Sequence, residues 1–194
     1  LLVLGLNIRN RERLPLHGPA IVAANHNSHL DTLVLLSLFP LRDIHKVRPA
    51  AAADYFLSTP WLAWFSRNLI GIVPVTRSAG GAHRDPLAEC YSALERGEIL
   101  LIFPEGTRGE PETMQKLKSG IAHLAQHYPQ ASVVPVFMHG LGRAMPKGEC
   151  LLVPVFCDLF VGEPMGWSGD KAGFMQALEA QFTSLQARLN PKQI

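Results

Sequence analysis

The sequence predicts a single α/β domain in which a mostly parallel mixed sheet is flanked by helices. Short apolar runs alternate along the chain with segments of helical periodicity. The run 99–103 is apolar throughout, which is typical of a strand covered on both faces. Polar residues follow several of these runs directly, and open α/β sheets place their chemistry at such strand ends.

The strands are predicted from apolar runs bounded by glycine, proline or polar clusters. They cover residues 20–24, 45–53, 71–75, 99–103, 132–138 and 151–161. Gly18-Pro19 precedes the first. In the fifth, Pro135 implies an edge position, a bulge or the start of the strand. Ahead of them all, arginines at 9, 11 and 13 alternate along the chain, which favours a solvated edge strand.

The helices are predicted from apolar spacing and from their end signals. They cover residues 33–38, 60–69, 86–97, 120–127 and 170–189. Pro40 ends the first. Thr59-Pro60 and Asp85-Pro86 each combine an N-cap with proline at the first helical position, and Ser119 is the expected N-cap of the fourth. The inner face of the last helix is expected to consist of Phe174, Leu178, Phe182, Leu185 and Leu189.

Composition limits the possible functions. With 194 residues, of which 47% are hydrophobic and 18% charged, the chain can bury a full core, and we expect one domain over residues 1–194. The net charge of +2 is too small to indicate a nucleic-acid partner but suits phosphate-bearing substrates or anionic lipid. A mean hydropathy of +0.11 suggests an apolar groove or a membrane-facing surface. Three unpatterned cysteines indicate buried thiols in a reducing compartment.

The apolar runs also bear on membrane attachment. None of them reaches the roughly 18 residues of a spanning helix. Because the sequence begins at Leu1 rather than Met, we expect an N-terminal truncation, which could have removed an anchoring or targeting segment.

The densest polar cluster, Asn25 to Asp31, lies between the first strand and the first helix. A histidine and an aspartate across such a turn can meet, so that the carboxylate fixes one imidazole nitrogen while the other accepts a proton. Neither serine nor cysteine is placed there as an obvious nucleophile. The sequence therefore predicts that His26 acts as a base, that Asp31 orients it, and that the substrate's own hydroxyl group attacks.

Two other interpretations of these residues remain open. Ser28 and Asp31 have capping-box spacing, with Asp in place of the usual Glu, so that Asp31 would only cap the helix. His26, His29 and Asp31 could instead ligate a metal ion. We expect no metal, because the spacing matches no zinc signature and neither CxxC nor HExxH occurs in the sequence.

A second polar stretch, Pro104 to Gly109, follows the fourth strand. Because the carboxyl ends of parallel strands meet at one edge, we expect the strand-end sites to converge there: His26, Arg77, Glu105, Arg108 and the 138–140 turn. The two guanidinium groups could hold phosphate oxygens bidentately while His26 takes a hydroxyl proton. The pattern suits a substrate that carries both a phosphate and a hydroxyl group.

Four blocks, in the same order, resemble the glycerolipid acyltransferases related to 1-acylglycerol-3-phosphate acyltransferase. Asn25-His26 through Asp31 resembles the family's His-four-residues-Asp motif. The stretch 71–77, ending in Arg77, is similar to the second block. Residues 103–108, Phe-Pro-Glu-Gly-Thr-Arg, match the third completely, and 134–136 resemble the fourth.

The resemblance implies a glycerol-3-phosphate acyltransferase-like fold and acyl transfer to a lysophospholipid, with 1-acylglycerol-3-phosphate expected as acceptor and acyl-CoA or acyl-carrier protein as donor. No cofactor is expected. His26 and Asp31 would be catalytic. The expected substrate-binding residues are Arg77, Glu105, Gly106, Thr107, Arg108 and Pro135, and Lys116 and Lys118 are candidates for donor binding. The enzyme would act peripherally, or through a lost anchor, on the cytoplasmic side of a membrane.

Two rival functions remain. A metal-dependent lipid ester hydrolase would use His26, His29 and Asp31. A non-catalytic lipid-binding module would use the aromatic segment 55–65, in which Trp61 and Trp64 share a helical face, as its membrane surface. That face is equally typical of a buried core helix.

Overall fold

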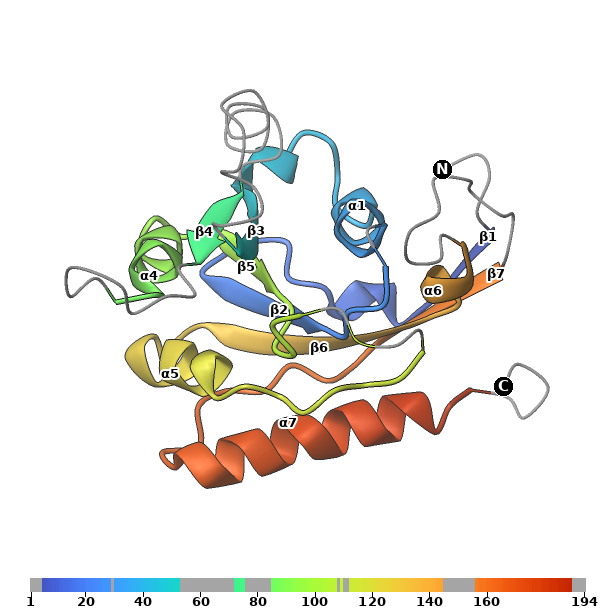
Figure 1. Cartoon of the computed structure of the whole chain (residues 1–194). Helices are drawn as coiled ribbons and strands as arrows, with labels where there is room; N and C mark the ends of the chain where they lie inside the picture. The colour runs from blue at the N-terminus through green and yellow to red at the C-terminus, as the bar shows by residue number, and fades with distance from the viewer. Residues whose placement is uncertain are drawn as a thin grey trace.

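A computed structural model describes residues 5–28, 30–52, 72–75, 85–107, 109, 112–144 and 156–189. The strands are β1 Gly5–Arg9, β2 Ala20–Ala24, β3 Val47–Ala52, β4 Val73–Val75, β5 Ile99–Ile102, β6 Ser132–His139 and β7 Phe156–Val161. The helices are α1 Asp31–Ser37, α4 Ala88–Glu95, α5 Gly120–His127, α6 Leu141–Ala144 and α7 Lys171–Gln186, with 3-10 turns η1 Arg11–Arg13 and η2 Ile44–Lys46. Over these residues the chain forms a layered α/β structure (Figure 1).

The described strands form one seven-stranded sheet in the order β1-β7-β6-β2-β5-β3-β4. Strands β6, β2, β5, β3 and β4 pair in parallel, whereas β7 runs antiparallel to β6 and parallel to β1. The predicted fold class, a mostly parallel mixed sheet flanked by helices, is confirmed. All five parallel strands therefore end at the same edge of the sheet, which sets the place of the site.

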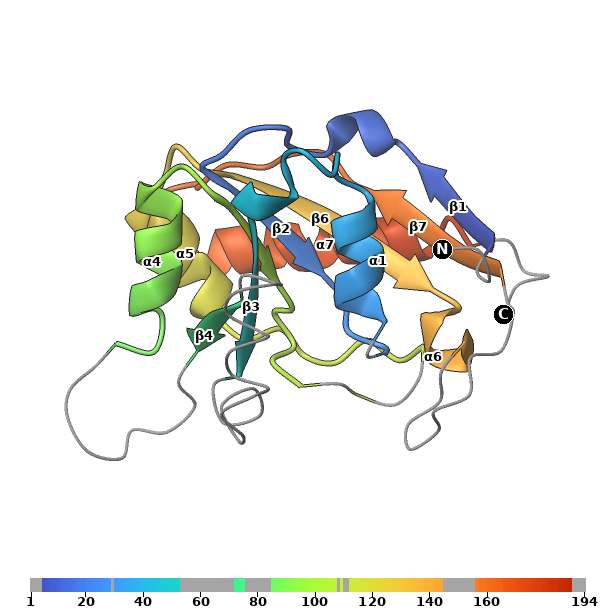
Figure 2. The same cartoon turned by 90° about the horizontal axis from the view of Figure 1, so that it is seen from above.

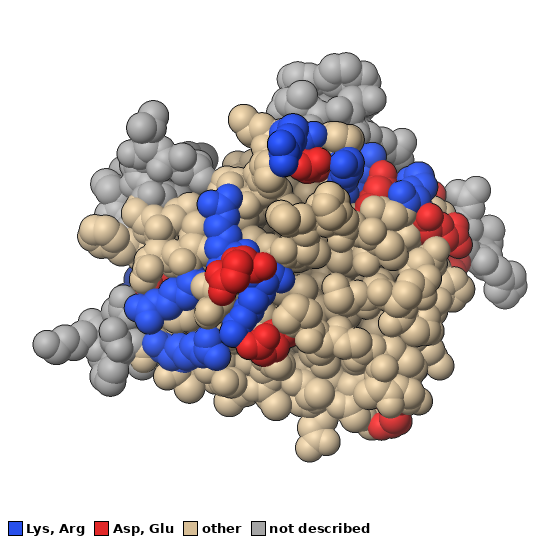
Figure 3. Space-filling model, turned by 180° about the vertical axis from the view of Figure 1, so that it is seen from behind, with Lys and Arg blue, Asp and Glu red and all other residues tan. Residues whose placement is uncertain are grey.

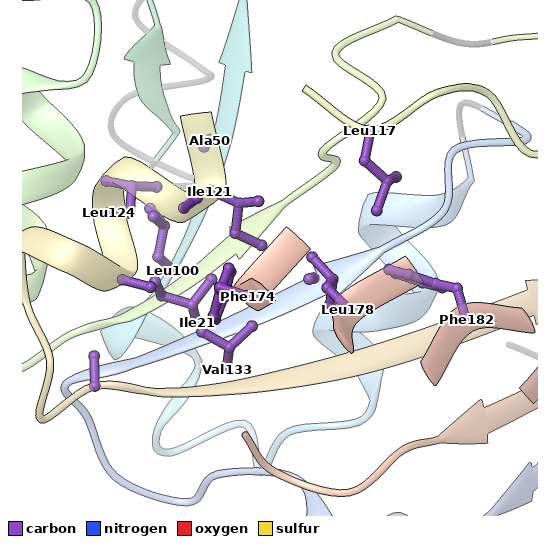
Figure 4. Packing of buried hydrophobic residues seen from close by; sticks show 14 of the residues in the cluster. Ile21, Ala50, Leu100, Leu117, Ile121, Leu124, Val133, Phe174, Leu178 and Phe182 are labelled. Carbon is purple, nitrogen blue, oxygen red and sulfur yellow. The ribbon is translucent and has the colours of Figure 1, made fainter. Parts of the chain in front are cut away.

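Helices cover both faces of the sheet. Helix α1 lies on one face, and α5 and α7 lie on the other (Figures 1 and 2). Neighbouring residues of β2 point in opposite directions, so that Ile21 packs toward α5 and α7, as Figure 4 shows, while Val22 packs toward α1. Two apolar faces explain why the central strands are continuous apolar runs.

Helix α7 confirms the predicted inner face. Phe174, Leu178 and Phe182 are fully buried against the sheet (Figure 4). Leu185 and Leu189 are buried in the same cluster. Asp170 caps this helix by accepting a hydrogen bond from the Gly173 N–H group at 2.6 Å. The predicted helix 60–69, with Trp61 and Trp64, lies outside the described residues.

Strand β6 meets one of the three alternatives predicted for Pro135, a bulge, and excludes the other two. It lies between β2 and β7 in the interior of the sheet, so an edge position was wrong, and Pro135 is not at its start. Pro135 O accepts a hydrogen bond from Gly162 N, just beyond the end of β7. Proline has no backbone N–H group, so the ladder between β6 and β7 lacks only its last hydrogen bond. From the Val136–Val161 pair to the Val133–Met165 bridge, β6 moves three residues and its partner four. This extra residue on the partner side is a local bulge.

The N-terminal arginines are only partly in a strand. Arg9 ends the edge strand β1, but Asn10 is left-handed, with φ of 60°, and directs Arg11 and Arg13 into η1. Arg11 donates to Leu38 O at 2.7 Å. Figure 3 shows a face of the molecule on which Lys and Arg side chains lie next to Asp and Glu side chains. The prediction of a solvated strand through all three arginines was therefore wrong, because their backbone turns.

Within the described part of the chain, every helix is too short or too polar to span a bilayer. Cys90 and Cys157 are buried, as predicted, and Cys150 lies outside the described residues. Burial raises the pKa of Cys90 to about 12 and that of Cys157 to about 11, so both remain thiols at neutral pH.

Candidate active site

The candidate site lies at the edge where the parallel strands end. His26 follows β2, Glu105 follows β5, and His139 closes β6. The three strands are neighbours, because β2 pairs with both β5 and β6. The sheet thus brings side chains from distant parts of the sequence to one rim, as predicted for His26 and Glu105.

His26 and Asp31 form the predicted pair. His26 Nδ1 lies 2.8 Å from Asp31 Oδ2. The aspartate side chain is fully buried, whereas the histidine side chain is 20% exposed. A hydrogen bond from Nδ1–H to the carboxylate leaves Nε2 as the nitrogen that can accept a proton. The geometry is that of a base with its orienting carboxylate.

Asp31 also binds the backbone of the turn before α1. Its Oδ2 atom accepts hydrogen bonds from the backbone N–H groups of Asn27, at 2.6 Å, and Ser28, at 2.8 Å. The bond from Ser28 N is the reciprocal bond of a capping box. The other half of the box is not made, because Ser28 Oγ accepts from Leu30 N, and among the described residues α1 has no side-chain cap. The interpretation of Asp31 as a helix cap was therefore wrong, and its Oδ2 atom joins the turn to His26 instead.

Glu105 holds the backbone of the 25–31 turn. Its Oε1 accepts from His26 N at 2.8 Å, and its Oε2 accepts from Gln115 N at 2.7 Å. The residue is only 2% exposed. Burial raises the pKa of Glu105 above its ordinary value of 4.5, while the two backbone N–H groups act in the opposite direction. Both of its oxygens face protein, so Glu105 orients the turn.

Two asparagines join the turn to β6. Asn25 Nδ2 donates to Met138 O at 2.8 Å, and Asn25 Oδ1 accepts from Met138 N at 2.7 Å. Asn27 Nδ2 donates to the same Met138 O at 2.8 Å. The Asn25 side chain therefore continues the pairing of β2 with β6 after β2 has ended, and satisfies buried backbone groups that would otherwise lack partners.

The ring of Phe103 packs against the imidazole ring of His26. The two rings stack with centroids 4.1 Å apart and an interplanar angle of 18°. Phe103 directly precedes the Pro104 turn. The stack restricts rotation of His26 about its side-chain bonds, in addition to the hydrogen bond from Nδ1.

The predicted donor-binding lysines lie in different surroundings. The side chain of Lys118 lies against Gly106, since a Cβ atom at Gly106 would approach Lys118 Nζ to 2.7 Å. Gly106 has φ of 73°, which glycine adopts without strain. Thr107, Lys116 and Lys118 are all exposed, so the two lysines differ only in that Lys118 lies beside Gly106. Lys118 thus brings a positive charge to the turn that follows Glu105.

Other predicted residues are not brought to the rim, or cannot be placed. Pro135 lies inside β6, where its ring would contact a Cβ atom at Gly162. Arg77, Arg108 and His29 lie outside the described residues. Among the described residues, His, Cys, Asp and Glu form no group of three that could hold a metal ion. The metal-site interpretation needs His29, so it stays undecided.

The site also contains residues to which sequence reasoning gave no role. Phe103, Gln115 and Glu112 take part in it only because the strands place them there, whereas His139 lies in the 138–140 turn that was expected at this rim. His139 carries a recognisable signal, since it is a polar residue at the end of an apolar run. Glu112 carries none, because its partners lie far away in sequence.

The acyltransferase family matches the chain over residues 5–157. A chloroplastic 1-acyl-sn-glycerol-3-phosphate acyltransferase of Arabidopsis thaliana is 32% identical over 145 residues, which is 74% of this chain and 38% of that protein. The 1-acyl-sn-glycerol-3-phosphate acyltransferase alpha of Bos taurus is 27% identical over 176 residues, 89% of this chain and 58% of that protein. The chain thus spans about two fifths to three fifths of the length of these relatives.

A solved structure shares the fold. The crystal structure of the 1-acyl-sn-glycerophosphate acyltransferase PlsC from Thermotoga maritima superposes with a TM-score of 0.72. The match covers 95% of this chain and 72% of that one, at 21% sequence identity. The fold is therefore one already seen in a solved protein.

Proposed function

The chain belongs to the acyltransferase family, and on that premise we propose that it moves a fatty acyl group to the hydroxyl of a lysophospholipid. The proposed acceptor is 1-acylglycerol-3-phosphate, and the proposed donor is acyl-CoA or acyl-carrier protein. The observation that carries the proposal is the 2.8 Å contact between His26 Nδ1 and Asp31 Oδ2, at the end of β2.

In the proposed reaction, His26 Nε2 removes the proton from the acceptor hydroxyl as its oxygen attacks the thioester carbonyl. Asp31 keeps Nδ1 protonated and stabilises the imidazolium ion that forms. General-base catalysis of this kind contributes about 10²–10⁴ in rate. The stack on Phe103 and the bond from His26 N to Glu105 hold the base in place while the proton moves.

The attack forms a tetrahedral intermediate with an oxyanion, which requires hydrogen-bond donors. When the carbon–sulfur bond breaks, the imidazolium returns the proton to the leaving thiolate. The products are the diacyl lipid and the free thiol of the carrier. The balance of atoms is complete without a metal ion or an acyl-enzyme intermediate.

The phosphates of the acceptor and of the donor both require positive charge at the rim. Lys118, which lies against Gly106, supports an anion site beside Glu105. We assign Arg77 and Arg108 to the acceptor phosphate by resemblance, and Lys116 and Lys118 to donor phosphates. Bidentate arginine contacts to phosphate are directional, whereas a lysine acts mainly as a point charge.

The proposed place of action is the cytoplasmic surface of a membrane. The acceptor is a lipid, and two large apolar side chains near α1, Leu33 and Leu41, are 49% and 85% exposed. Flotation with anionic phospholipid vesicles tests this proposal. Protein that stays at the bottom of the gradient at every salt concentration would contradict it.

The decisive experiment is an acyl-transfer assay with labelled acyl-CoA or acyl-carrier protein and a panel of lysophospholipids, read by product mass. His26→Ala is expected to lower the rate by about 10²–10⁴. His123→Ala, an exposed histidine on α5, is the matched control and should keep the wild-type rate. Transfer retained in His26→Ala would refute the proposed base. If the protein instead hydrolyses lipid esters and needs added metal to do so, the result favours the lipid hydrolase. If it binds vesicles but shows no turnover, the result favours the lipid-binding module.

A further inference from the structure

A second carboxylate from the loop between β5 and α5 reaches the end of β6. Glu112 Oε2 lies 2.8 Å from His139 Nδ1 and accepts from Gly140 N at 3.0 Å. Its Oε1 accepts from Gly142 N at 3.1 Å. The side chains of Glu112 and His139 are 13% and 9% exposed. One carboxylate thus holds three N–H groups at the point where β6 passes into α6.

The backbone of Glu112 is in an uncommon conformation. Its φ of 60° lies in the left-handed region, which costs a residue with a side chain about 1–2 kcal/mol. Such conformations persist where surrounding contacts over-determine them, and they are concentrated at functional sites. The three contacts at the end of β6 are described contacts of the kind that can over-determine such a conformation.

A short chain of hydrogen bonds connects the end of β6 to His26, the proposed catalytic base. Met138, the residue before His139, accepts from the side chains of Asn25 and Asn27. Asn27 in turn donates its backbone N–H to Asp31 Oδ2, which orients His26. The 25–31 turn is therefore held on one side by Glu105 and on the other by the end of β6.

We propose that Glu112, paired with His139, is a positioning residue that holds the end of β6 and, through Met138, the 25–31 turn in its productive geometry. The effect on rate rests on the proposed acyl transfer, whereas the effect on the turn does not. Glu112 touches no reacting atom in this arrangement. It acts through the Met138 carbonyl group, which accepts hydrogen bonds from the side chains of Asn25 and Asn27.

The charge state of Glu112 suits this role. Burial raises its pKa, but hydrogen bonds from His139 and from the Gly140 and Gly142 N–H groups outweigh burial, so the pKa lies below the ordinary 4.5. The side chain is a carboxylate at neutral pH and can accept with both oxygens.

The kinetic test compares Glu112→Gln with Glu98→Gln. Glu98 is a matched control because its side chain is 12% exposed and pairs with Arg48 and Arg96 at the opposite, amino end of β5. Glutamine at 112 replaces one acceptor oxygen by an NH₂ group, which cannot accept from an N–H group. We expect Glu112→Gln to lower kcat by about tenfold to a hundredfold, with the KM of the acceptor within about twofold, whereas Glu98→Gln keeps both values.

A double substitution separates positioning from general damage. If Glu112 acts through His139, Glu112→Gln combined with His139→Gln should lower kcat no further than the more damaging single variant. Losses that multiply would show two independent effects and would contradict the pairing.

A second readout does not depend on activity. The backbone amides of Asn27 and Ser28 donate to Asp31, so their hydrogen exchange reports the order of the turn. We expect exchange about tenfold faster in Glu112→Gln, with the Phe182 amide of α7 unchanged as the reference for global stability.

The outcomes distinguish the two proposals. If the wild type transfers acyl groups but Glu112→Gln matches Glu98→Gln in both kcat and exchange, the positioning role is refuted and the proposed function stands. If the wild type transfers nothing but the Asn27 and Ser28 amides still loosen in Glu112→Gln, the proposed function fails and the positioning of the turn stands.

Discussion

Glu105 Oε1 accepts a hydrogen bond from the backbone N–H group of His26 at 2.8 Å, although 79 positions separate the two residues. Because β2 and β5 are parallel neighbours, the turns that follow them lie side by side. The buried carboxylate of one turn thus satisfies a backbone donor of the other. The relationship explains why a glutamate follows directly on an apolar strand and Pro104.

The double role of Asp31 predicts losses of both activity and stability. Asp31→Ala should lower the rate by about 10²–10⁴, because His26 loses its orienting partner. It should also cost about 0.5–2 kcal/mol of unfolding free energy, because the Asn27 and Ser28 N–H groups lose their acceptor. Asp170→Ala, which removes the cap of α7, should cost a similar free energy and leave the rate unchanged. Urea unfolding and the transfer assay measure the two effects, and equal rates in both variants would contradict the catalytic role.

The two contacts of Glu105 predict that an uncharged isostere cannot replace it. In Glu105→Gln one oxygen is replaced by an NH₂ group that faces a backbone N–H group, either that of His26 or that of Gln115. An unsatisfied buried donor costs about 1–3 kcal/mol. We expect lower stability in urea and a lower kcat, because the backbone of His26 shifts. A variant with wild-type kcat would show that this bond does not position the base.

The turn after β6 predicts a steric effect that can be separated from a conformational one. Gly140 has φ of 91°, and a Cβ atom there would lie 2.7 Å from Phe156 O. Gly169 has φ of 84°, but among the described residues no atom beyond its chain neighbours would lie within 4 Å of a Cβ atom added there. Both glycine-to-alanine variants should lose about 1 kcal/mol or more from the positive φ. Gly140→Ala should lose more because of the contact, as thermal unfolding would show, and equal losses would mean that the backbone at Phe156 gives way.

Glu112 predicts how stability depends on pH. Its pKa in the folded protein lies below the ordinary 4.5, so the folded state binds its proton less readily than the unfolded state. The stabilisation is therefore present above about pH 4.5 and is lost as the pH falls through the folded pKa. The unfolding free energy of wild type minus that of Glu112→Gln should shrink between about pH 7 and pH 3. A difference that grows on acidification would contradict the assigned direction.

The sequence alone determined the class of fold and most of its elements. Alternation of apolar runs with helical segments is a local property, and it correctly predicted the central strands and the buried face from Phe174 to Leu189. It also paired His26 with Asp31, because five positions across a turn are close in any fold of that turn. It was wrong about the arginines, where one left-handed residue, Asn10, decides the outcome. For Pro135 it left three alternatives open, and the structure contains the bulge.

Only the tertiary structure decided what holds that pair in place. Glu105, Met138 and Glu112 reach the 25–31 turn or its support from other strands and loops, so their partners depend on the order of strands in the sheet. Strand order is set by the packing of both sheet faces over the whole chain. No local pattern in the sequence encodes it, and this is why a glutamate in a loop, without any motif, could be recognised only from the atoms it contacts.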